Sequence, residues 1–271
     1  LAPMAPFLTR ARRGLALIAA LLALCVLAGA APSGKAWFRG DFETGTLEGW
    51  IWDRPNPRSI QVVTQPVRKG RYAVRVELAP GDISASKERC ELKVGDKRIE
   101  RVHGRHSGEM WYGWSLFVPA AYVDSPGSEF QILGQWHHRP IAAAPGARPR
   151  VTGPPPLTLH LGVRDGKNVL HLLGRPSPQA PRRTLGSGAI RRGTWTDLVF
   201  HIRWSTGKDG FVQAWLDGRP FTQGKVYGPT LYTPESNYLR LGLYRSKGST
   251  SKNHVFYDEV RIGDSYQAVS P

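Results

Sequence analysis

The chain consists largely of short stretches in which apolar and polar residues alternate, separated by turn residues. Strand side chains point to opposite faces in turn, so this period-two pattern predicts β-strands with one buried face. Glycine (30) and proline (22) are plentiful, and no long helical periodicity appears. We therefore expect an all-β fold, a β-jelly roll sandwich of two antiparallel sheets with a concave groove. The clearest predicted strands span residues 60–64, 72–78, 109–118, 157–163, 168–173, 196–204, 211–216, 238–244 and 255–262.

Connections between these strands carry two kinds of signal. Asp-Gly pairs at residues 165–166, 209–210 and 217–218 predict hairpin turns. The segments 140–156 and 176–192 are rich in Pro, Arg and Gly, and we expect both to be loops. They could be solvated spacers or, equally, basic walls of a groove, the second one through Arg182, Arg183, Arg191 and Arg192.

The first thirty residues have the pattern of a secretory signal peptide. Arg10, Arg12 and Arg13 form a basic region, residues 15–28 are apolar, and Ala28-Gly29-Ala30 resembles a cleavage site. The apolar run is short for a transmembrane span, so no stable membrane insertion is expected. This pattern predicts a secreted or periplasmic protein.

The expected organisation is a signal peptide at 1–30 and one β domain at 31–271. Two alternatives are an uncleaved membrane anchor and a lipoprotein attached through Cys25. The bulky Leu24 before Cys25 argues against lipid attachment.

Charge and cysteine content suggest the kind of partner and the kind of core. The formal net charge is +16, and loss of the three N-terminal arginines would lower it to +13. Strong positive charge in an exported protein favours an acidic partner such as a polysaccharide, a lipopolysaccharide, a nucleic acid or a membrane surface. An arginine-rich proteome is the alternative explanation. Without the leader, Cys90 is the sole cysteine, so we expect a single core that has no disulfide and buries Cys90. We also expect a monomer.

Three predicted strands carry polar residues on one face and apolar residues on the other. Their sequences are Glu-Arg-Cys-Glu-Leu-Lys at 88–93, Gln-Trp-His at 135–137 and Tyr-Leu-Arg-Leu-Gly-Leu-Tyr at 238–244. The alternation predicts a groove face with basic, amide and aromatic side chains. That face holds Arg89, Glu91, Lys93, Gln135, His137, Tyr238, Arg240 and Tyr244, whereas Cys90, Leu92, Leu239, Leu241 and Leu243 point into the core.

The three strands resemble, in the same order, the motif strands of jelly-roll polysaccharide lyases of the alginate lyase type. Those enzymes have an Arg-Thr/Ser-Glu-Leu-Arg strand, a Gln-Ile-His strand and a Tyr-Phe-Lys-Ala-Gly-x-Tyr strand. The departures here are Cys90 for Thr or Ser, Lys93 for Arg and Arg240 for Lys, and the last two keep the positive charge. The wider pattern resembles the heparin lyase I and glucuronan lyase superfamily through residues 41–43, 111–119, 135–137, 195–201 and 256–260.

This resemblance implies a secreted lyase that cleaves a uronic-acid polysaccharide by β-elimination. The candidate substrates are glucuronan-like polymers first, then heparin-like polymers and alginate, and no cofactor is required. The reaction removes the proton at C5 and expels the oxygen at C4, and charge on the neighbouring carboxylate must be stabilised. By resemblance, Arg89, Gln135 and His137 surround that carboxylate. Lys93, Glu91, Arg240 and Tyr238 are the expected substrate-binding residues.

Two residues can move the protons. By resemblance, Tyr244 serves as base, acid or both. When the C5 proton and the C4 oxygen lie on the same side of the sugar, as in glucuronate and mannuronate, Tyr244 could serve both. In guluronate and iduronate they lie on opposite sides, and His137 would be the natural base. A phenol has a reference pKa of ~10, so a tyrosine base needs cationic neighbours, for which Arg89 and Arg240 are the candidates.

Other histidines and acids suggest further sites. His160, His171 and His201 are expected to face away from the core, and any of them could line the groove. If the first and last strands meet, Glu43 and Asp258 could hold a structural calcium ion through their carboxylates. The alternative is that they are ordinary surface acids.

Three other functions compete with the lyase hypothesis. A glycoside hydrolase needs two carboxylates facing the sugar bond, and Glu91 is the only acid on the three groove faces. A non-catalytic, lectin-like carbohydrate-binding module for acidic glycans would use the same groove, but it does not need the pair of His137 and Tyr244. A nucleic-acid binder would fit the charge, but no recognised binding motif accompanies it.

Overall fold

A computed structural model describes residues 34–85, 87–95, 108–124, 130–138 and 153–271. The predicted signal peptide, Cys25 and most of the predicted loop at 140–156 lie outside these ranges. Residues Gly34–Pro271 form one compact unit. Across the described ranges, no helix is long and apolar enough to span a membrane.

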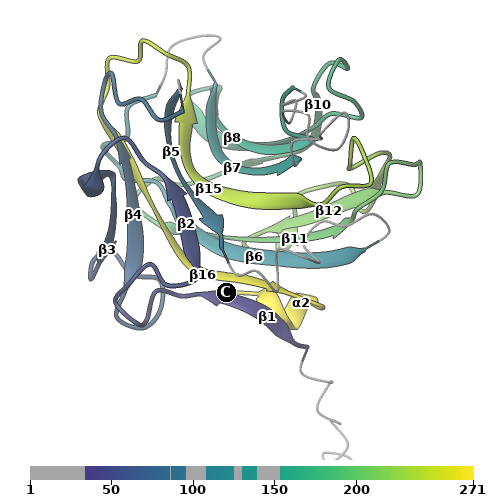
Figure 1. The fold of residues 1–271 in the computed structure, drawn as a ribbon, viewed down its shortest axis with the longest axis horizontal. Helices are drawn as coiled ribbons and strands as arrows, with labels where there is room; N and C mark the ends of the chain where they lie inside the picture. The colour runs from purple at the N-terminus through teal and green to yellow at the C-terminus, as the bar shows by residue number, and fades with distance from the viewer. Residues whose placement is uncertain (1–33, 86, 96–107, 125–129, 139–152) are drawn as a thin grey trace, which may run out of the picture. The chain divides into compact units, whose positions relative to one another are not determined.

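Two antiparallel sheets lie face to face in this unit (Figure 1). Among the described residues, the larger has nine strands in the order β13-β12-β11-β6-β16-β4-β3, with β1 beside β16 and β14 beside β12. Its strands are β1 (Ala36–Gly40), β3 (Ile60–Val63), β4 (Ala73–Leu78), β6 (Glu109–Phe117), β11 (Trp195–Arg203), β12 (Phe211–Leu216), β13 (Arg219–Pro220), β14 (Val226–Tyr227) and β16 (Asn253–Gly263).

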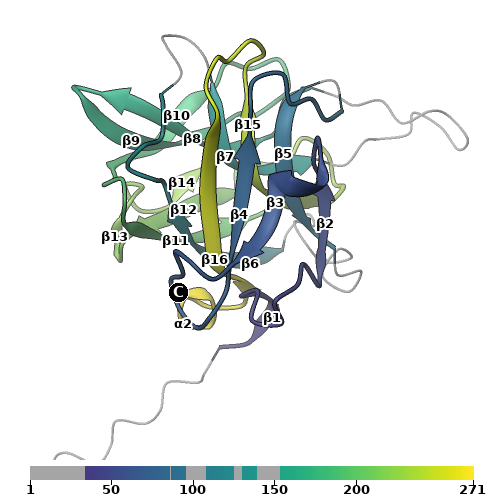
Figure 2. The same ribbon diagram turned by 90° about the vertical axis from the view of Figure 1, so that its left-hand side faces the viewer.

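The second sheet has seven strands in the order β10-β9-β8-β7-β15-β5-β2. It comprises β2 (Trp50–Asp53), β5 (Glu88–Val94), β7 (Gln131–His138), β8 (Leu157–Arg164), β9 (Lys167–Gly174), β10 (Arg183–Ala189) and β15 (Asn237–Arg245). In the described ranges, helical turns are limited to the short η1 (Pro57–Ser59) and α2 (Tyr266–Val269), and α2 is seen beside β1 and β16 in Figure 2. The all-β jelly-roll prediction is confirmed.

The hydrophobic core lies between the two sheets. It takes the apolar face of each alternating strand, including Leu92, Leu239, Leu241 and Leu243, which are at most 1% exposed. Cys90 is also fully buried, and its thiol donates to the Ser59 carbonyl at 3.4 Å. The expectation that Cys90 is a small core residue is therefore confirmed. Because one face of each site strand is committed to this core, the other face must point outward.

Two local predictions were wrong. The segment 176–192 is not all loop, because β10 occupies its second half and pairs with β9. The sequence of β10, Arg-Thr-Leu-Gly-Ser-Gly-Ala, has few β-branched residues and no aromatic one, so its pairing partner rather than its propensity makes it a strand. Asp209-Gly210 ends a longer connection between β11 and β12, whereas the pairs at 165–166 and 217–218 form tight turns with positive φ.

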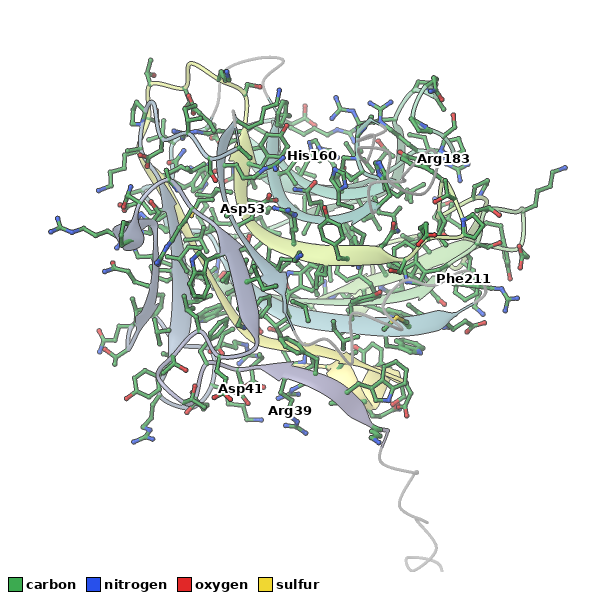
Figure 3. All side chains as sticks on the ribbon, in the orientation of Figure 1. Arg39, Asp41, Asp53, His160, Arg183 and Phe211 are labelled. Carbon is green, nitrogen blue, oxygen red and sulfur yellow. The ribbon has the colours of Figure 1, made fainter. Side chains whose placement is uncertain are left out.

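The order of β7, β15 and β5 brings the three polar-faced strands together. Tyr244 of β15 pairs with Arg89 of β5, and Tyr238 pairs with His137 of β7. Arg240 lies between, opposite Lys93 on one side and Gln135 on the other. In Figure 3, His160 and Asp53 mark this side of the molecule, whereas Arg39 and Asp41 lie on the opposite side.

Gly242 allows β15 to lie close to β5 between Arg240 and Tyr244. A Cβ atom at this position would meet the Cys90 carbonyl oxygen at 2.2 Å and the Glu91 Cα at 2.7 Å. We predict that Gly242→Ala lowers the free energy of unfolding by about 1–3 kcal/mol, as measured by urea denaturation. The matched control is Gly134→Ala on β7, where the nearest atoms are side-chain carbons at 3.4 Å or more. Equal stability of the two variants would contradict this account of the strand contact.

Candidate active site

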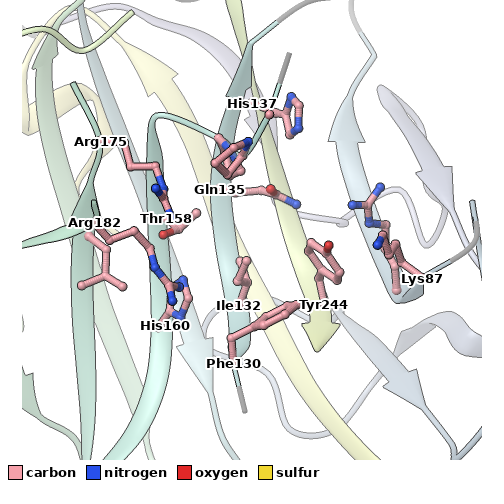
Figure 4. A pocket seen from close by; sticks show the side chains of 15 residues that line it. Lys87, Phe130, Ile132, Gln135, His137, Thr158, His160, Arg175, Arg182 and Tyr244 are labelled. Carbon is pink, nitrogen blue, oxygen red and sulfur yellow. The ribbon is translucent and has the colours of Figure 1, made fainter. Parts of the chain in front are cut away.

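A cavity of about 460 Å³ opens on the outward face of the seven-stranded sheet. It is lined by all four predicted catalytic residues, Arg89 from β5, Gln135 and His137 from β7, and Tyr244 from β15 (Figure 4). Residues far apart in the chain thus meet at one place because their strands are neighbours. The other lining residues are Lys87, Phe130, Ile132, Gly153, Pro154, Pro155, Thr158, His160, Leu173, Arg175 and Arg182.

Glu91 lies beneath this cavity and contacts three side chains, those of Arg89, Gln135 and Arg240. Its side chain is 1% exposed. One carboxylate oxygen accepts a hydrogen bond from the Gln135 amide. The other lies 3.0 Å from Arg89 Nε, in an ion-pair contact without hydrogen-bond alignment, and 3.3 Å from Arg240 Nη1. A buried charge is stable only when it is paired and hydrogen-bonded in this way.

Glu91 does not present a free carboxylate to the cavity, and its predicted role in substrate binding stays a prediction. Its carboxylate is covered and its oxygens are already engaged by protein groups. Gln135 is fully buried as well and forms part of the cavity floor, and its Oε1 has no hydrogen-bond partner. Glu91 contacts both arginines and the Gln135 amide beneath the cavity.

Arg89 stacks on Tyr244 at the centre of the cavity. The guanidinium carbon lies 4.3 Å from the centre of the phenol ring. Phe130 packs edge-on against the same ring, with the ring centres 5.0 Å apart. The Tyr244 hydroxyl points toward Gln135 (Figure 4), and no described residue provides it with a hydrogen-bond partner. Tyr244 thus has the predicted cationic neighbour in Arg89 and a hydroxyl that is free to meet a substrate.

His137 is held as a neutral ring. Its Nδ1 lies 2.8 Å from the His138 carbonyl oxygen, so Nδ1 donates the hydrogen bond and Nε2 keeps its lone pair. Burial lowers the pKa of His137 to about 4, and the charges of His138, Arg240 and Arg89 lower it further, against the opposing effect of that backbone bond. The imidazole is therefore uncharged at neutral pH.

His137 and Tyr244 lie at different ends of the strand pair. Tyr244 is opposite Ile132, and His137 is opposite Tyr238. Ile132 and His137 are five positions apart on β7, which corresponds to a backbone separation of roughly 16 Å at the usual strand rise. Gln135 lies between these two ends, two positions from His137 and three from Ile132, so the amide connects Tyr244 and Arg89 to His137 within one cavity.

The predicted substrate-binding residues surround the His137 end. Tyr238 stacks on His137 with ring centres 5.7 Å apart. Lys93 Nζ and the guanidinium carbon of Arg240 lie 5.1 and 5.2 Å from the centre of the Tyr238 ring. Arg240 is also paired with Asp53 and Glu91, so it is not the free cation that was expected beside Tyr244. Substrate binding by Lys93, Arg240 and Tyr238 stays a prediction.

The sequence reading missed part of the cavity wall. Lys87 lies two positions before Arg89, and extending the alternation by one step would have found it. Arg175, which precedes the predicted loop at 176–192, was missed, whereas Arg182 belongs to that loop and lines the cavity, as one of the two alternatives for the loop expected. Of the three histidines suggested for the groove, His160 lines the cavity, whereas His201 lies on β11 of the other sheet and bonds to Glu109 at 2.8 Å.

The two carboxylates suggested for calcium are occupied by backbone groups. Glu43 accepts hydrogen bonds from the N–H groups of Arg71 and Tyr72, and Asp258 accepts from those of Arg68 and Lys69. In the part of the chain that the structure describes, no group of three or more His, Cys, Asp or Glu side chains is arranged to hold a metal ion. The calcium hypothesis has no supporting donor set and stays a prediction. The expected meeting of first and last strands does occur, between β1 and β16.

Comparison with solved structures places this fold among carbohydrate-active enzymes. It is similar to an endo-β-1,4-glucuronan lyase from the fungus Trichoderma reesei, with 20% identity, a TM-score of 0.64, and coverage of 88% of this chain and 99% of that chain. The catalytic domain of a glycoside hydrolase family 131 protein from Coprinopsis cinerea gives 14% identity, a TM-score of 0.60, and coverage of 88% and 98%. An alginate lyase from Pseudomonas aeruginosa gives 17% identity, a TM-score of 0.50, and coverage of 80% and 98%.

These identities are low, so the solved structures show a shared fold and do not assign an activity. No curated protein matches the chain. A family model described as polysaccharide lyase, however, matches residues 42–261, which include every strand of the seven-stranded sheet. The chain therefore belongs to the polysaccharide lyase family.

Proposed function

We propose that this polysaccharide lyase cleaves a uronic-acid polymer by β-elimination, with a glucuronan-like polymer as the first candidate and heparin-like polymers and alginate as the next ones. The observation that carries the proposal is the cavity itself. Arg89, Gln135, His137 and Tyr244 line it together, and none of its described lining residues is acidic. A basic, carboxylate-free cavity suits an anionic sugar whose negative charge grows during the reaction.

The reaction needs one group that takes the C5 proton and one that gives a proton to the leaving oxygen. As the C5–H bond breaks, its electron pair forms the C4=C5 double bond and the C4–O bond is released. Negative charge builds on the substrate carboxylate in the transition state. Arg89, held in place by Glu91, is the cation best placed to stabilise it, and the Gln135 amide lies beside it on the cavity floor.

We assign both proton transfers to Tyr244. Its phenolate takes the C5 proton, and the phenol so formed gives that proton to the leaving C4 oxygen. Its hydroxyl is free, its ring lies under Arg89, and Gln135 is beside it. His137 is displaced along the groove, and a proton carrier must come within hydrogen-bond reach of the atom it serves. One residue can serve both steps when the C5 proton and the C4 oxygen lie on the same side, as in glucuronate and mannuronate. The geometry thus supports a glucuronan-like substrate over guluronate-rich alginate.

The competing functions are less well supported. A glycoside hydrolase would place two carboxylates at the sugar bond, whereas Glu91 is buried and Asp53 is paired with Arg240. A lectin-like module would not need a free tyrosine hydroxyl under an arginine. The arginine-rich, apolar N-terminal segment supports export, which places the enzyme with extracellular polymers.

A panel of polymers tests the proposal directly. The protein is incubated with glucuronan, alginate, heparin and hyaluronan, and the ultraviolet absorbance of the unsaturated product is followed. We expect the fastest rise with glucuronan. Binding to these polymers without any rise in absorbance would favour the lectin-like alternative.

Removal of the Tyr244 hydroxyl should abolish the chemical step. We predict that Tyr244→Phe lowers kcat by at least a hundredfold, because general acid–base groups contribute roughly 10²–10⁴-fold. His137→Gln should act mainly on KM, since we place that residue at the binding end of the groove. A larger loss of kcat in the His137 variant than in the Tyr244 variant would reverse these two roles.

Protonation of His137 links acid pH to stability. The folded pKa of about 4 lies below the unfolded value of 6.5, so the unfolded chain takes up the proton first as the solution is acidified. The contribution of the neutral His137 ring to the free energy of unfolding is present above pH 6.5 and is lost as the pH falls toward 4. At pH 5 the free energy of unfolding should be lower by about 2 kcal/mol. Urea unfolding at pH 8 and pH 5 should show a smaller acid loss in His137→Gln than in the wild type. The same loss in both proteins would contradict the neutral-ring assignment.

Variants of two glutamates on β5 can distinguish an effect on the positions of the active-site groups from an effect on stability alone. Glu91→Gln removes the charge that holds Arg89 and Arg240, and we predict a loss of both stability and lyase activity, the latter at least tenfold. Glu88 is the matched control, because it is similarly buried but does not line the cavity. Its carboxylate accepts a hydrogen bond from Arg245 Nε at 2.8 Å. Glu88→Gln should lower the free energy of unfolding but leave kcat/KM near the wild-type value. Equal losses of activity in the two variants would show that Glu91 has no special role.

A further inference from the structure

One flank of the cavity has no task in the proton transfers. It lies across from Lys87, on the far side of Tyr244, and is formed by β8 and by the connection between β9 and β10. Figure 4 shows His160 and Arg182 close together on this flank, with Arg175 and Thr158 beside them. Four polar or charged side chains thus border a space that the reacting sugar does not explain.

His160 is a buried ring with an unused nitrogen. Its side chain is 7% exposed, and Nε2 has no hydrogen-bond partner. A buried polar atom left in this state is unfavourable, and a ligand that supplies a hydrogen-bond partner removes this cost. Ile132 on β7 pairs with Tyr244 on one side and with His160 on the other. His160 therefore lies two strand spacings, about 10 Å, from Tyr244.

His160 is also uncharged. Burial lowers the pKa of His160 to about 3, and the nearby positive charge of Arg182 contributes in the same direction. A neutral imidazole can donate a hydrogen bond to an anionic or hydroxyl oxygen without the cost of burying a charge.

Arg182 is presented to this flank by a braced turn. The Arg175 guanidinium donates to the Ala180 carbonyl, and the Arg175 backbone N–H donates to the Pro156 carbonyl at 2.9 Å. The Ala180 N–H is held by Ser177 at 3.2 Å. Among the described residues, Arg182 itself makes no hydrogen bond or ion pair, and no acid lines the cavity to neutralise it. Arg182 is therefore a free cation in front of an unpaired buried donor.

The apolar part of the wall increases the effect of this charge. Ile132 and Leu173 line the cavity beside His160. Apolar walls exclude water, and an ion pair is stronger where water is excluded. An anion on this flank would meet a cation, a neutral donor and an apolar backing together.

We propose that His160 and Arg182 form a second acidic-group site, which binds the carboxylate of a neighbouring sugar while Tyr244 acts on the sugar that is cleaved. The inference rests on the proposed β-elimination of a uronic-acid polymer and specifies its substrate further. The enzyme then requires acidic groups on closely spaced sugars, and a polymer whose uronates are diluted by neutral sugars is a poor substrate.

Glucuronan and the same polymer after partial carboxyl reduction provide the test. Reduction converts some carboxylates to neutral alcohols and keeps the linkage, so cleavable uronates remain but many neighbours lose their charge. We expect the wild-type kcat/KM, counted per remaining uronate, to fall at least tenfold on the reduced polymer. Arg182→Ala should lose roughly tenfold on native glucuronan but little further activity on the reduced polymer, because the interaction is already absent.

Arg183→Ala is the matched control. Arg183 is the adjacent arginine, but its guanidinium donates to the Tyr227 carbonyl at 3.2 Å and does not line the cavity. The Arg183→Ala variant should keep the wild-type ratio of kcat/KM between native and reduced glucuronan. His160→Gln, which retains a donor, should lose less discrimination than His160→Leu.

The outcomes separate this inference from the proposed function. If the wild type releases no unsaturated product from native glucuronan or from any other uronan, the β-elimination proposal fails. If the wild type is active but Arg182→Ala loses the same factor on both polymers, or loses nothing, the second site is wrong and the lyase assignment stands. The second site is supported if Arg182→Ala no longer prefers native over reduced glucuronan while Arg183→Ala still does.

Discussion

The active face depends on one buried carboxylate. Glu91 contacts Arg89 on its own strand and reaches Gln135 and Arg240 on the two neighbouring strands. A charge at 1% exposure would be very unfavourable alone, so the fold retains it only with these partners. The same contacts keep the guanidinium and amide groups in fixed positions before a substrate arrives. Preorganised donors of this kind stabilise a developing negative charge without reorganising during the reaction.

Around this anchor the groove has distinct parts. Arg89 and Tyr244 form the centre, where the guanidinium stacks on the phenol ring. His137 and Tyr238 extend the groove in one direction along the strands, and His160 with Arg182 extend it across the sheet. A surface with several basic regions is suited to a long anionic polymer that must be held at more than one sugar.

Much of the fold was predictable from the sequence because alternation depends on local residues alone. The strand containing Tyr238, Arg240 and Tyr244 was found within one residue at each end. β10 was missed because its glycines and serine carry no strand signal and the strand is defined by its pairing with β9. Alternation also assigns a side chain to a face of the sheet but does not give its exposure to solvent. It could therefore not show that the Glu91 carboxylate is buried beneath the arginines. Composition suggested that Arg182 lies in a loop, but it could not decide between a groove wall and a solvated spacer, because contacts within the turn place the side chain.

The chemistry of bond cleavage is the central claim, and the mass of the products tests it most directly. Glucuronan is digested and the oligosaccharides are measured by mass spectrometry. β-Elimination predicts new non-reducing ends that are one water lighter than those of hydrolysis, because the C4=C5 double bond replaces an added water. Products carrying the full mass of hydrated ends would contradict the account and would point to hydrolysis in the same groove.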